Sequence, residues 1–271
     1  MPYYDNKESF DLYNEDFYKG EQDGSLNSAS IIVNTILEYI KPKSVIDVGC
    51  GTGAFLKAFK DNHVNTIKGI DGEWVKNNML LIPEDNFIKA DISAPFHLNS
   101  DCDSQFDLAL CLEVGEHISS SKSDILIQNL VKLSNIILFS AAIPFQGGTH
   151  HINERPPKYW AKKFKTKGYE CLDIIRFKLF EYPQVSSFYK QNVLLYINNS
   201  VIPKYPLLEK EIIKRKNTFP KFITFPIGLD TLSSRINKTR YYFIMTIIYP
   251  FYTISYRIFR NVLKFRLRDY L

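Results

Sequence analysis

Three histidines stand near carboxylates in two short segments of this chain, and histidine exchanges a proton readily near neutral pH. His117 lies four residues after Glu113, while His150 and His151 follow a Gly-Gly-Thr run and precede Glu154. Such a base would take the proton from a hydroxyl group that accepts a transferred group. We predict His151 as this base, because the glycines beside it permit a close approach of substrate. His117 and Glu113 are the further catalytic candidates.

A metal site made by His150, His151 and Glu154 is the alternative use of the second segment. Adjacent histidines in an extended loop point to opposite sides, however, and the sequence indicates no third ligand. The sequence therefore predicts no metal site. Glu154 is expected either to orient His151 or to lie on the surface as a solvated carboxylate.

A glycine-rich run, Asp47-Val48-Gly49-Cys50-Gly51-Thr52-Gly53, follows a short apolar segment. Glycines where a strand turns into a helix let the backbone bend tightly and let a ligand approach, and the first N–H groups of the helix are free. Dinucleotides and S-adenosylmethionine both bind at such a turn. Gly49, Gly51 and Ala54 fit the dinucleotide spacing, and Asp71, 20 residues beyond Gly51, suits a ribose contact in either case. The loop by itself leaves the choice open.

Strand and helix patterns alternate about every 20 residues from Ser44 onward. Strands are predicted at residues 44–48, 66–70, 86–90, 106–112, 136–139, 170–177 and 192–198. Helices are predicted at residues 28–40, 54–59, 124–133 and 157–167. This alternation predicts an α/β fold with a parallel sheet that carries helices on both faces. Acids that follow strands would then gather at the edge of the sheet where such folds bind ligands.

The charges of the chain are divided unevenly along its length. Residues 204–271 hold 14 of the 34 Lys and Arg but 4 of the 29 Asp and Glu, so they carry +10, and the remaining part carries −5 of the net +5. We predict an enzyme domain at 1–203 and a basic, aromatic-rich, mainly helical extension at 204–271. At 45% hydrophobic residues the chain is too apolar for a disordered protein.

The predicted extension contains 16 uncharged residues, 241–256, which is shorter than a usual membrane span, and a basic helical pattern follows them. Packing on its own domain, peripheral contact with a membrane surface and homo-oligomer formation remain open for it. Nucleic acid is disfavoured, because no known binding module is present. The four cysteines form no CxxC pair, and acidic residues stand near Met1 where a signal peptide needs an apolar run. We therefore expect a cytoplasmic protein, at most peripheral at the inner membrane surface.

The DVGCGTG run at 47–53 resembles the first motif of class I S-adenosylmethionine-dependent methyltransferases. The resemblance implies that Asp47 lies near the methionine part of this cofactor, that Asp71 holds the ribose hydroxyls, and that Asp91 recognises the adenine. A carboxylate suits the ribose, because it accepts hydrogen bonds from two adjacent hydroxyls. The cofactor-binding residues so implied are Asp47, Gly49, Cys50, Gly51, Gly53, Asp71, Gly72, Asp91, Ile92 and Glu113.

Later segments extend the resemblance over roughly residues 3 to 198. Residues 106–118 look like the fourth-strand region of many small-molecule methyltransferases. Residues 139–160 and the late Tyr189, Gln191 and Asn192 resemble bacterial methyltransferases often found with sugar-nucleotide and surface-polysaccharide enzymes. The resemblance implies a Rossmann-like, doubly wound, mostly parallel seven-stranded sheet with an antiparallel last strand. It also implies O-methylation of a small acceptor, a saccharide or surface-glycan precursor, in polysaccharide biosynthesis.

Two other functions remain open on the sequence. An NAD-dependent oxidoreductase can carry the same glycine loop on a similar fold. A non-catalytic scaffold of the same fold could act through its basic extension. A nucleic acid substrate is disfavoured, since no Asn-Pro-Pro-Tyr or Asp-Pro-Pro-Tyr run follows the fourth predicted strand, where Leu112-Glu113-Val114-Gly115 stands instead.

Overall fold

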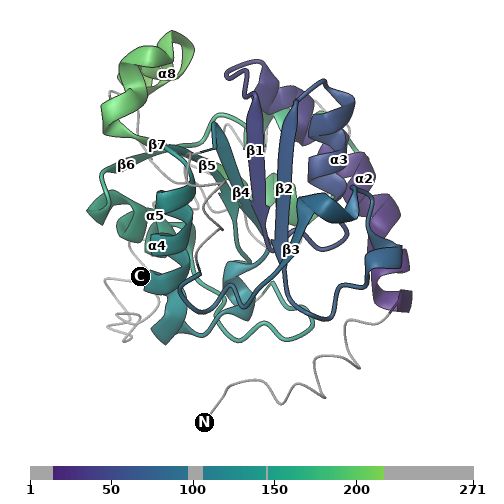
Figure 1. Ribbon diagram of the computed structural model, residues 1–271. Coiled ribbons are helices and arrows are strands. Elements are labelled where there is room, and N and C mark those ends of the chain that lie inside the picture. Colours follow the sequence, from purple (N-terminus) through teal and green to yellow (C-terminus); the bar gives the residue numbers. More distant parts are fainter. Residues whose placement is uncertain (1–14, 97–105, 145, 217–271) are drawn as a thin grey trace. The chain divides into compact units, whose positions relative to one another are not determined.

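The computed structural model describes residues 15–96, 106–144 and 146–216, which are coloured in Figure 1. For 15–24 and 215–216 the description covers the backbone alone. The apolar run at 241–256 and the basic helical pattern after it lie outside the described residues. Their predicted contacts with a membrane, a second subunit or the domain itself therefore remain predictions.

One seven-stranded sheet runs through the described part of the chain, in the order β3-β2-β1-β4-β5-β7-β6. Its strands are β1 (Ser44–Val48), β2 (Thr66–Asp71), β3 (Phe87–Lys89), β4 (Leu108–Leu112), β5 (Ile136–Ser140), β6 (Tyr169–Leu172) and β7 (Leu194–Asn198). The pairs from β3 across to β5 are parallel, and β7 is antiparallel to both β5 and β6. The predicted mostly parallel sheet with an antiparallel last strand is thereby confirmed.

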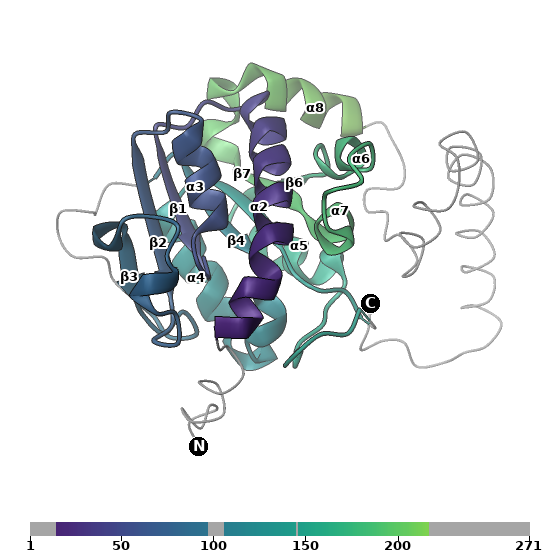
Figure 2. The same ribbon diagram turned by 90° about the vertical axis from the view of Figure 1, so that its right-hand side faces the viewer.

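Helices cover both faces of this sheet, as Figures 1 and 2 show. The α-helices are α2 (Glu15–Leu37), α3 (Ala54–Asp61), α4 (Ser123–Leu133), α5 (Pro157–Thr166), α6 (Arg176–Leu179), α7 (Ser187–Asn192) and α8 (Pro206–Lys216). Alternate strand residues point to opposite faces. Val45 of β1 packs in the cluster that includes residues of α2 and α3, whereas its neighbour Ile46 packs in the cluster that includes α4 and α5. The two apolar layers hold the strand ends in fixed positions.

Two predicted elements differ from the structure for identifiable reasons. The strand predicted at 170–177 ends at Leu172, because the fully buried Arg176 begins α6 and donates to the Asp173 carboxylate and, at 2.6 Å, to the Gln191 carbonyl oxygen. Asp173 and Arg176 form an ion pair and are three residues apart. Because their side chains meet, the chain turns here instead of continuing as a strand. The strand prediction for residues 173–177 was wrong.

The first helix was predicted to begin at Ser28 but α2 begins at Glu15. Ser28 does not cap a helix start: it is fully buried, and its hydroxyl oxygen accepts the Ser186 N–H at 3.0 Å. For every other predicted strand and helix named above, each end is within two residues of the corresponding end of the observed element. Phe106, predicted as the start of the fourth strand, instead makes a single bridge to Ser134.

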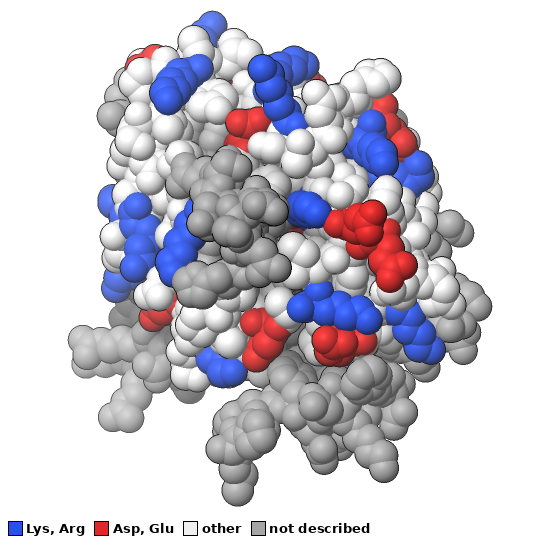
Figure 3. Space-filling model, viewed as in Figure 1, with Lys and Arg blue, Asp and Glu red and all other residues white. Residues whose placement is uncertain are grey.

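The described start of the predicted extension, residues 204–216, includes α8. Leu208 of this helix is fully buried in the cluster that contains residues of α2 and α3. Among the described residues no helix is both long and apolar enough to cross a membrane. On the face seen in Figure 3, both Lys or Arg and Asp or Glu side chains are exposed among the described residues.

Candidate functional site

The carboxyl ends of four parallel strands carry most of the predicted site. Asp47 lies on β1 and Asp71 ends β2, while Glu113 directly follows β4 and Ser140 ends β5. Parallel strands end at one edge of the sheet, which is where open α/β sheets bind ligands. The parallel pairing of β1 with β2 and β4 therefore brings residues that lie far apart in the sequence to that edge.

The glycine loop after β1 follows a path that only glycine adopts without strain. Gly49, Gly51 and Gly53 have φ angles of 81°, 52° and 88°, all in the left-handed region. A Cβ on Gly49 would lie 2.3 Å from a methyl carbon of Val114, so this glycine also permits close packing against the β4 loop. The Gly49 N–H donates to the Ile70 carbonyl oxygen at 2.8 Å, which ties the loop to the end of β2.

Asp71 joins the glycine loop to the turn after β2. One carboxylate oxygen accepts the Gly51 N–H and the other accepts the Gly72 N–H, each at 2.7 Å. The residue is 6% exposed. Burial raises the pKa of Asp71, and the two N–H donors oppose that rise because they favour the charged form. A Cβ on Gly72 would collide with the ring of Trp74, which therefore lies against this turn.

Asp47 is a second buried acid beside Asp71. Burial, and then the charge of Asp71, raise the pKa of Asp47 to about 7. The neighbouring thiol of Cys50 is also buried, and burial and the two acids keep its pKa well above the usual value. Two neighbouring carboxylates with little access to water favour a ligand that brings positive charge to this end of the site.

Asp91 and Ile92 follow β3 at the same edge of the sheet. Asp91 is exposed, lies two residues beyond the last residue of β3, and accepts the Ser93 N–H at 2.8 Å, so it stabilises a turn. Ile92 is 7% exposed and belongs to the core cluster that includes α4 residues. The predicted contact of Asp91 with adenine would use the exposed side of this turn.

Glu113 is held in an unusual conformation directly after β4. Its φ is 54°, in the left-handed region that a side chain rarely adopts. Its N–H donates to Ser140, while its carboxylate accepts hydrogen bonds from the side-chain amides of Asn192 (3.1 and 3.2 Å) and Gln146 (3.2 Å). Strained residues persist where their surroundings over-determine them, and they cluster at functional sites. Asn192 and Gln146 thus hold the Glu113 carboxylate, while Ser140 holds its main-chain N–H.

Glu116 lies three residues further, in the short helical turn η4 (Gly115–His117), and is fully buried. Within the described residues neither of its carboxylate oxygens has a hydrogen-bond partner. Burial, and then the charge of Glu113, raise the pKa of Glu116 well above its usual value. Burial also raises the pKa of Glu113, against the opposing hydrogen bonds led by that from Asn192. This edge of the sheet therefore holds a second pair of neighbouring acids, of which Glu116 is fully buried and Glu113 partly buried.

The loop after β5 docks on η4 through its main chain. The N–H groups of Ile152 and Asn153 both donate to the Glu116 carbonyl oxygen at 2.9 Å. The buried Asn153 amide also donates to the Gly115 carbonyl oxygen at 3.3 Å and to the Ser123 hydroxyl at 3.2 Å. These bonds bring the predicted histidines of the two segments together.

His117 and His151 meet edge to face, with ring centroids 5.1 Å apart. Nδ1 of His151 lies 3.1 Å from a carboxylate oxygen of Glu154, so the position of Glu154 fits the predicted orienting role. A Cβ on Gly148 would lie 2.3 Å from Nε2 of His151, which shows that the glycine makes room for the imidazole itself. His150 is exposed, so the two adjacent histidines do lie in different surroundings.

The electrostatics of His117 differ from those of an ordinary surface histidine. Burial, and then the neighbouring His151, lower the pKa of His117 to about 4. Its imidazole is therefore neutral at pH 7 and offers a lone pair on one ring nitrogen. A neutral imidazole can accept a proton or bind a metal ion, whereas the charged form can do neither.

Most of the predicted site residues share one edge of the sheet, and three further residues complete the arrangement. The sequence predictions did not include the full burial of Glu116 or the hydrogen bonds made by Gln146 and Asn153. Gln146 stands just before the two glycines at 147–148, so its position near the site had a local sequence indication. For Asn153, no sequence pattern indicated that it fastens one loop to another.

Comparison with known proteins identifies the domain type. A family model described as "Methyltransferase domain" matches residues 29–174, which is more than half of the 271-residue chain. The matched part contains the glycine loop, the acids at the strand ends and the histidines of both segments. No protein with a curated description matches the chain by sequence.

Similar solved structures include magnesium protoporphyrin IX methyltransferase from Synechocystis PCC 6803 with bound SAH. Its TM-score is 0.51 at 15% identity, over 72% of this chain and 100% of that one. An O-methyltransferase family protein from Burkholderia thailandensis has a TM-score of 0.48 at 11% identity, over 72% and 60% of the two chains. Human N-acetylserotonin methyltransferase in complex with SAM has a TM-score of 0.42 at 14% identity, over 64% of this chain and 51% of that one. The first of these likenesses supports the fold.

Proposed function

Because the chain belongs to the methyltransferase-domain family, we propose that it moves a methyl group from S-adenosylmethionine to the hydroxyl oxygen of a small saccharide or surface-glycan precursor. The observation that carries this proposal is the arrangement of one sheet edge. Buried Asp47 and Asp71 lie at the glycine loop, and the loops after β4 and β5 bring His117 and His151 together. The two acids suit a cationic nucleoside, and the two histidines suit proton removal from an acceptor.

The chemistry of the cofactor end favours S-adenosylmethionine over a dinucleotide. This cofactor carries a sulfonium and an ammonium group, and the Asp47–Asp71 pair favours positive charge. The sheet order also differs from the 3-2-1-4-5-6 order of dinucleotide-binding folds, because the antiparallel β7 lies between β5 and β6. An NAD-dependent reaction is therefore not favoured by the fold.

The acceptor end offers what an O-methylation needs. Methyl transfer is an in-line displacement in which the S–CH₃ bond breaks, an O–CH₃ bond forms and S-adenosylhomocysteine leaves. The acceptor hydroxyl must lose its proton, and His151, next to Glu154, is placed to take it, with His117 beside it. Side-chain amides and carboxylates, such as those of Gln146, Asn192 and Glu113, are the groups that bond sugar hydroxyls.

The raised pKa of Asp47 predicts a pH dependence of cofactor binding. Below about pH 7 the folded enzyme holds Asp47 protonated, and binding of the cationic cofactor must expel that proton. Affinity should therefore rise with pH, by up to roughly tenfold per pH unit, and level off above about pH 7. Isothermal titration calorimetry with S-adenosylmethionine between about pH 5.5 and about pH 7.5 measures this slope.

Asp47→Asn is the matched control for this slope, because it removes the titrating group and keeps the shape of the side chain. The variant should bind more weakly at neutral pH and show a flatter profile. Titration of the cofactor itself affects both proteins equally. An identical slope in Asp47→Asn and the unsubstituted protein would contradict the role given to Asp47.

Two measurements test the proposed function as a whole. Calorimetry with S-adenosylmethionine and with NAD(H) should give binding of the first alone; the reverse result would overturn the proposal. Mass spectrometry of cell-surface glycans and their precursors, from cells with and without this protein, should show one methyl group missing when it is absent. Cofactor binding with no change in any glycan or precursor would overturn the acceptor class but not the cofactor.

A further inference from the structure

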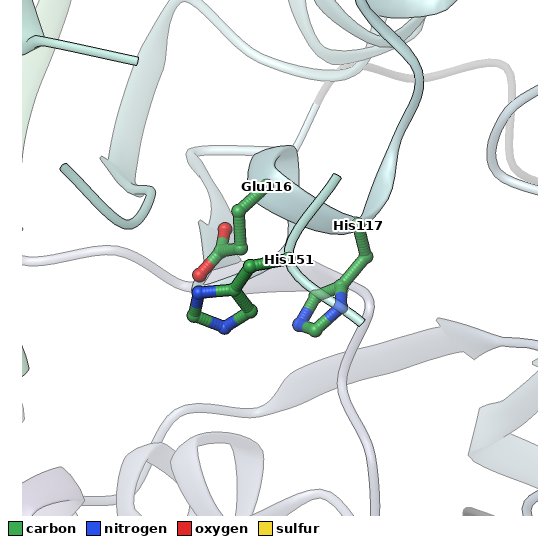
Figure 4. A group of neighbouring side chains, drawn as sticks. All are labelled: Glu116, His117 and His151. Carbon is green, nitrogen blue, oxygen red and sulfur yellow. The ribbon is translucent and has the colours of Figure 1, made fainter. Parts of the chain in front are cut away.

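We propose that Glu116, His117 and His151 form a binding site for one divalent first-row transition metal ion. One potential ligand atom from each residue lies within 4.8 Å of the others. Figure 4 shows the Glu116 carboxylate beside the ring of His151, with the ring of His117 on the other side of that imidazole. Ligand atoms about 2.1 Å from a shared ion are roughly 3–4 Å apart, so a small contraction of the three side chains would close the site.

The state of Glu116 is an independent reason to infer a cation. Its carboxylate is fully buried, and within the described ranges its two oxygens have no hydrogen-bond partner of normal geometry. The main-chain groups of Glu116 and Ala142 favour its charged form, but they do not offset its burial. Buried polar groups are normally partnered, and a buried carboxylate is ordinarily paired with a cation or bound to a metal. An ion between the carboxylate and the two imidazoles would supply the missing partner.

Glu154 lies where it can orient His151 as a metal ligand. Nδ1 of His151 is 3.1 Å from a Glu154 oxygen, and a metal-bound histidine typically donates its second ring N–H to a carboxylate in this manner. Donation from Nδ1 to Glu154 would leave the lone pair of the ring on Nε2. Glu154 would then orient a ligand instead of a base.

The ligand set selects the class of ion and its place in the reaction. Two imidazoles and one carboxylate suit Mn²⁺, Fe²⁺, Co²⁺ or Zn²⁺ better than Mg²⁺ or Ca²⁺, which prefer oxygen ligands. Three protein ligands leave coordination positions open. Resting on the proposed function, the ion would bind the acceptor hydroxyl and lower its pKa, so that its proton leaves to water before the oxygen attacks the methyl group. The free histidine base would then be unnecessary.

The test uses Co²⁺ alone with the full chain, freed of any histidine tag and stripped with a chelator. Calorimetry should show one Co²⁺ per chain, and the visible absorption of bound Co²⁺ should report nitrogen and oxygen ligands. Glu116→Gln and His151→Ala should each weaken binding roughly 100-fold or more. His150→Ala is the matched control, because this neighbouring histidine is exposed, and it should bind Co²⁺ as the unsubstituted protein does.

Failure of Co²⁺ to bind would overturn the proposal, and so would binding that Glu116→Gln and His151→Ala leave unchanged. Circular dichroism checks that each variant is folded, and if Glu116→Gln fails to fold, His151→Ala decides alone. Calorimetry with S-adenosylmethionine on the same samples separates the two hypotheses. Cofactor binding without Co²⁺ binding removes the metal site alone, whereas Co²⁺ binding without cofactor binding removes the proposed function alone.

Discussion

His151→Ala should lower the turnover of the enzyme by roughly 10²- to 10⁴-fold, the usual contribution of a positioned proton acceptor. The imidazole lies against His117 and next to Glu154, and no other described histidine occupies that position. The same loss follows if His151 binds an ion that activates the hydroxyl. The affinity for S-adenosylmethionine should stay unchanged, because the cofactor residues belong to the ends of β1 and β2.

Turnover is measured as release of S-adenosylhomocysteine with the glycan precursor that mass spectrometry identifies. His150→Ala serves as the control, since the exposed neighbour should retain full turnover. Addition and removal of a divalent ion distinguishes base catalysis by His151 from activation of the hydroxyl by an ion. A chelator should leave base catalysis unchanged and should stop an ion-assisted reaction. Full turnover by His151→Ala would remove the residue from both roles.

Asp71→Ala should weaken the binding of S-adenosylmethionine by about 100-fold or more, which corresponds to the loss of two charge-assisted hydrogen bonds of about 1.5–3 kcal/mol each. The carboxylate is proposed to hold the ribose hydroxyls. It also accepts the N–H groups of Gly51 and Gly72, so its removal loosens the glycine loop as well as the ribose contact. Both effects act in the same direction.

Calorimetry measures this loss, and thermal unfolding without cofactor shows how much of it comes from the loosened loop. Asp71→Asn keeps one acceptor oxygen, so its affinity for S-adenosylmethionine should lie between that of Asp71→Ala and that of the unsubstituted protein. Asp91→Ala is a useful comparison, because Asp91 is exposed and accepts only a local N–H among the described hydrogen bonds, so the effect on affinity should be about tenfold or less. Unchanged affinity in Asp71→Ala would contradict the assignment of this acid.

Local patterns were sufficient to predict most of the fold. The buried strands β1, β4 and β5 are apolar runs bounded by charged or polar residues, and the helices between them show helical periodicity. The strand predicted through 177 failed because Arg176 is buried on an ion pair with Asp173. The pattern of residues 170–177 does not reveal that Asp173 and Arg176 are both buried.

The arrangement of the residues proposed to bind the cofactor was predicted more completely than that of the residues proposed to bind the acceptor. Asp47 and Asp71 belong to strand ends, so the parallel sheet alone brings them together at the glycine loop. The arrangement of the residues proposed to bind the acceptor depends on contacts between distant loops. Asn153 reaches Gly115, and Glu113 is held by Asn192, at sequence separations of 38 and 79 residues. Spacing along the chain carries no information on such contacts.

The double hydrogen bond to the Glu116 carbonyl oxygen has a consequence for how an acceptor enters. Two N–H groups of the loop after β5 converge on this one atom, and Asn153 adds a third connection to the same turn. The two segments that carry His117 and His151 are therefore joined by three hydrogen bonds. An acceptor that entered by parting them would have to break all three bonds.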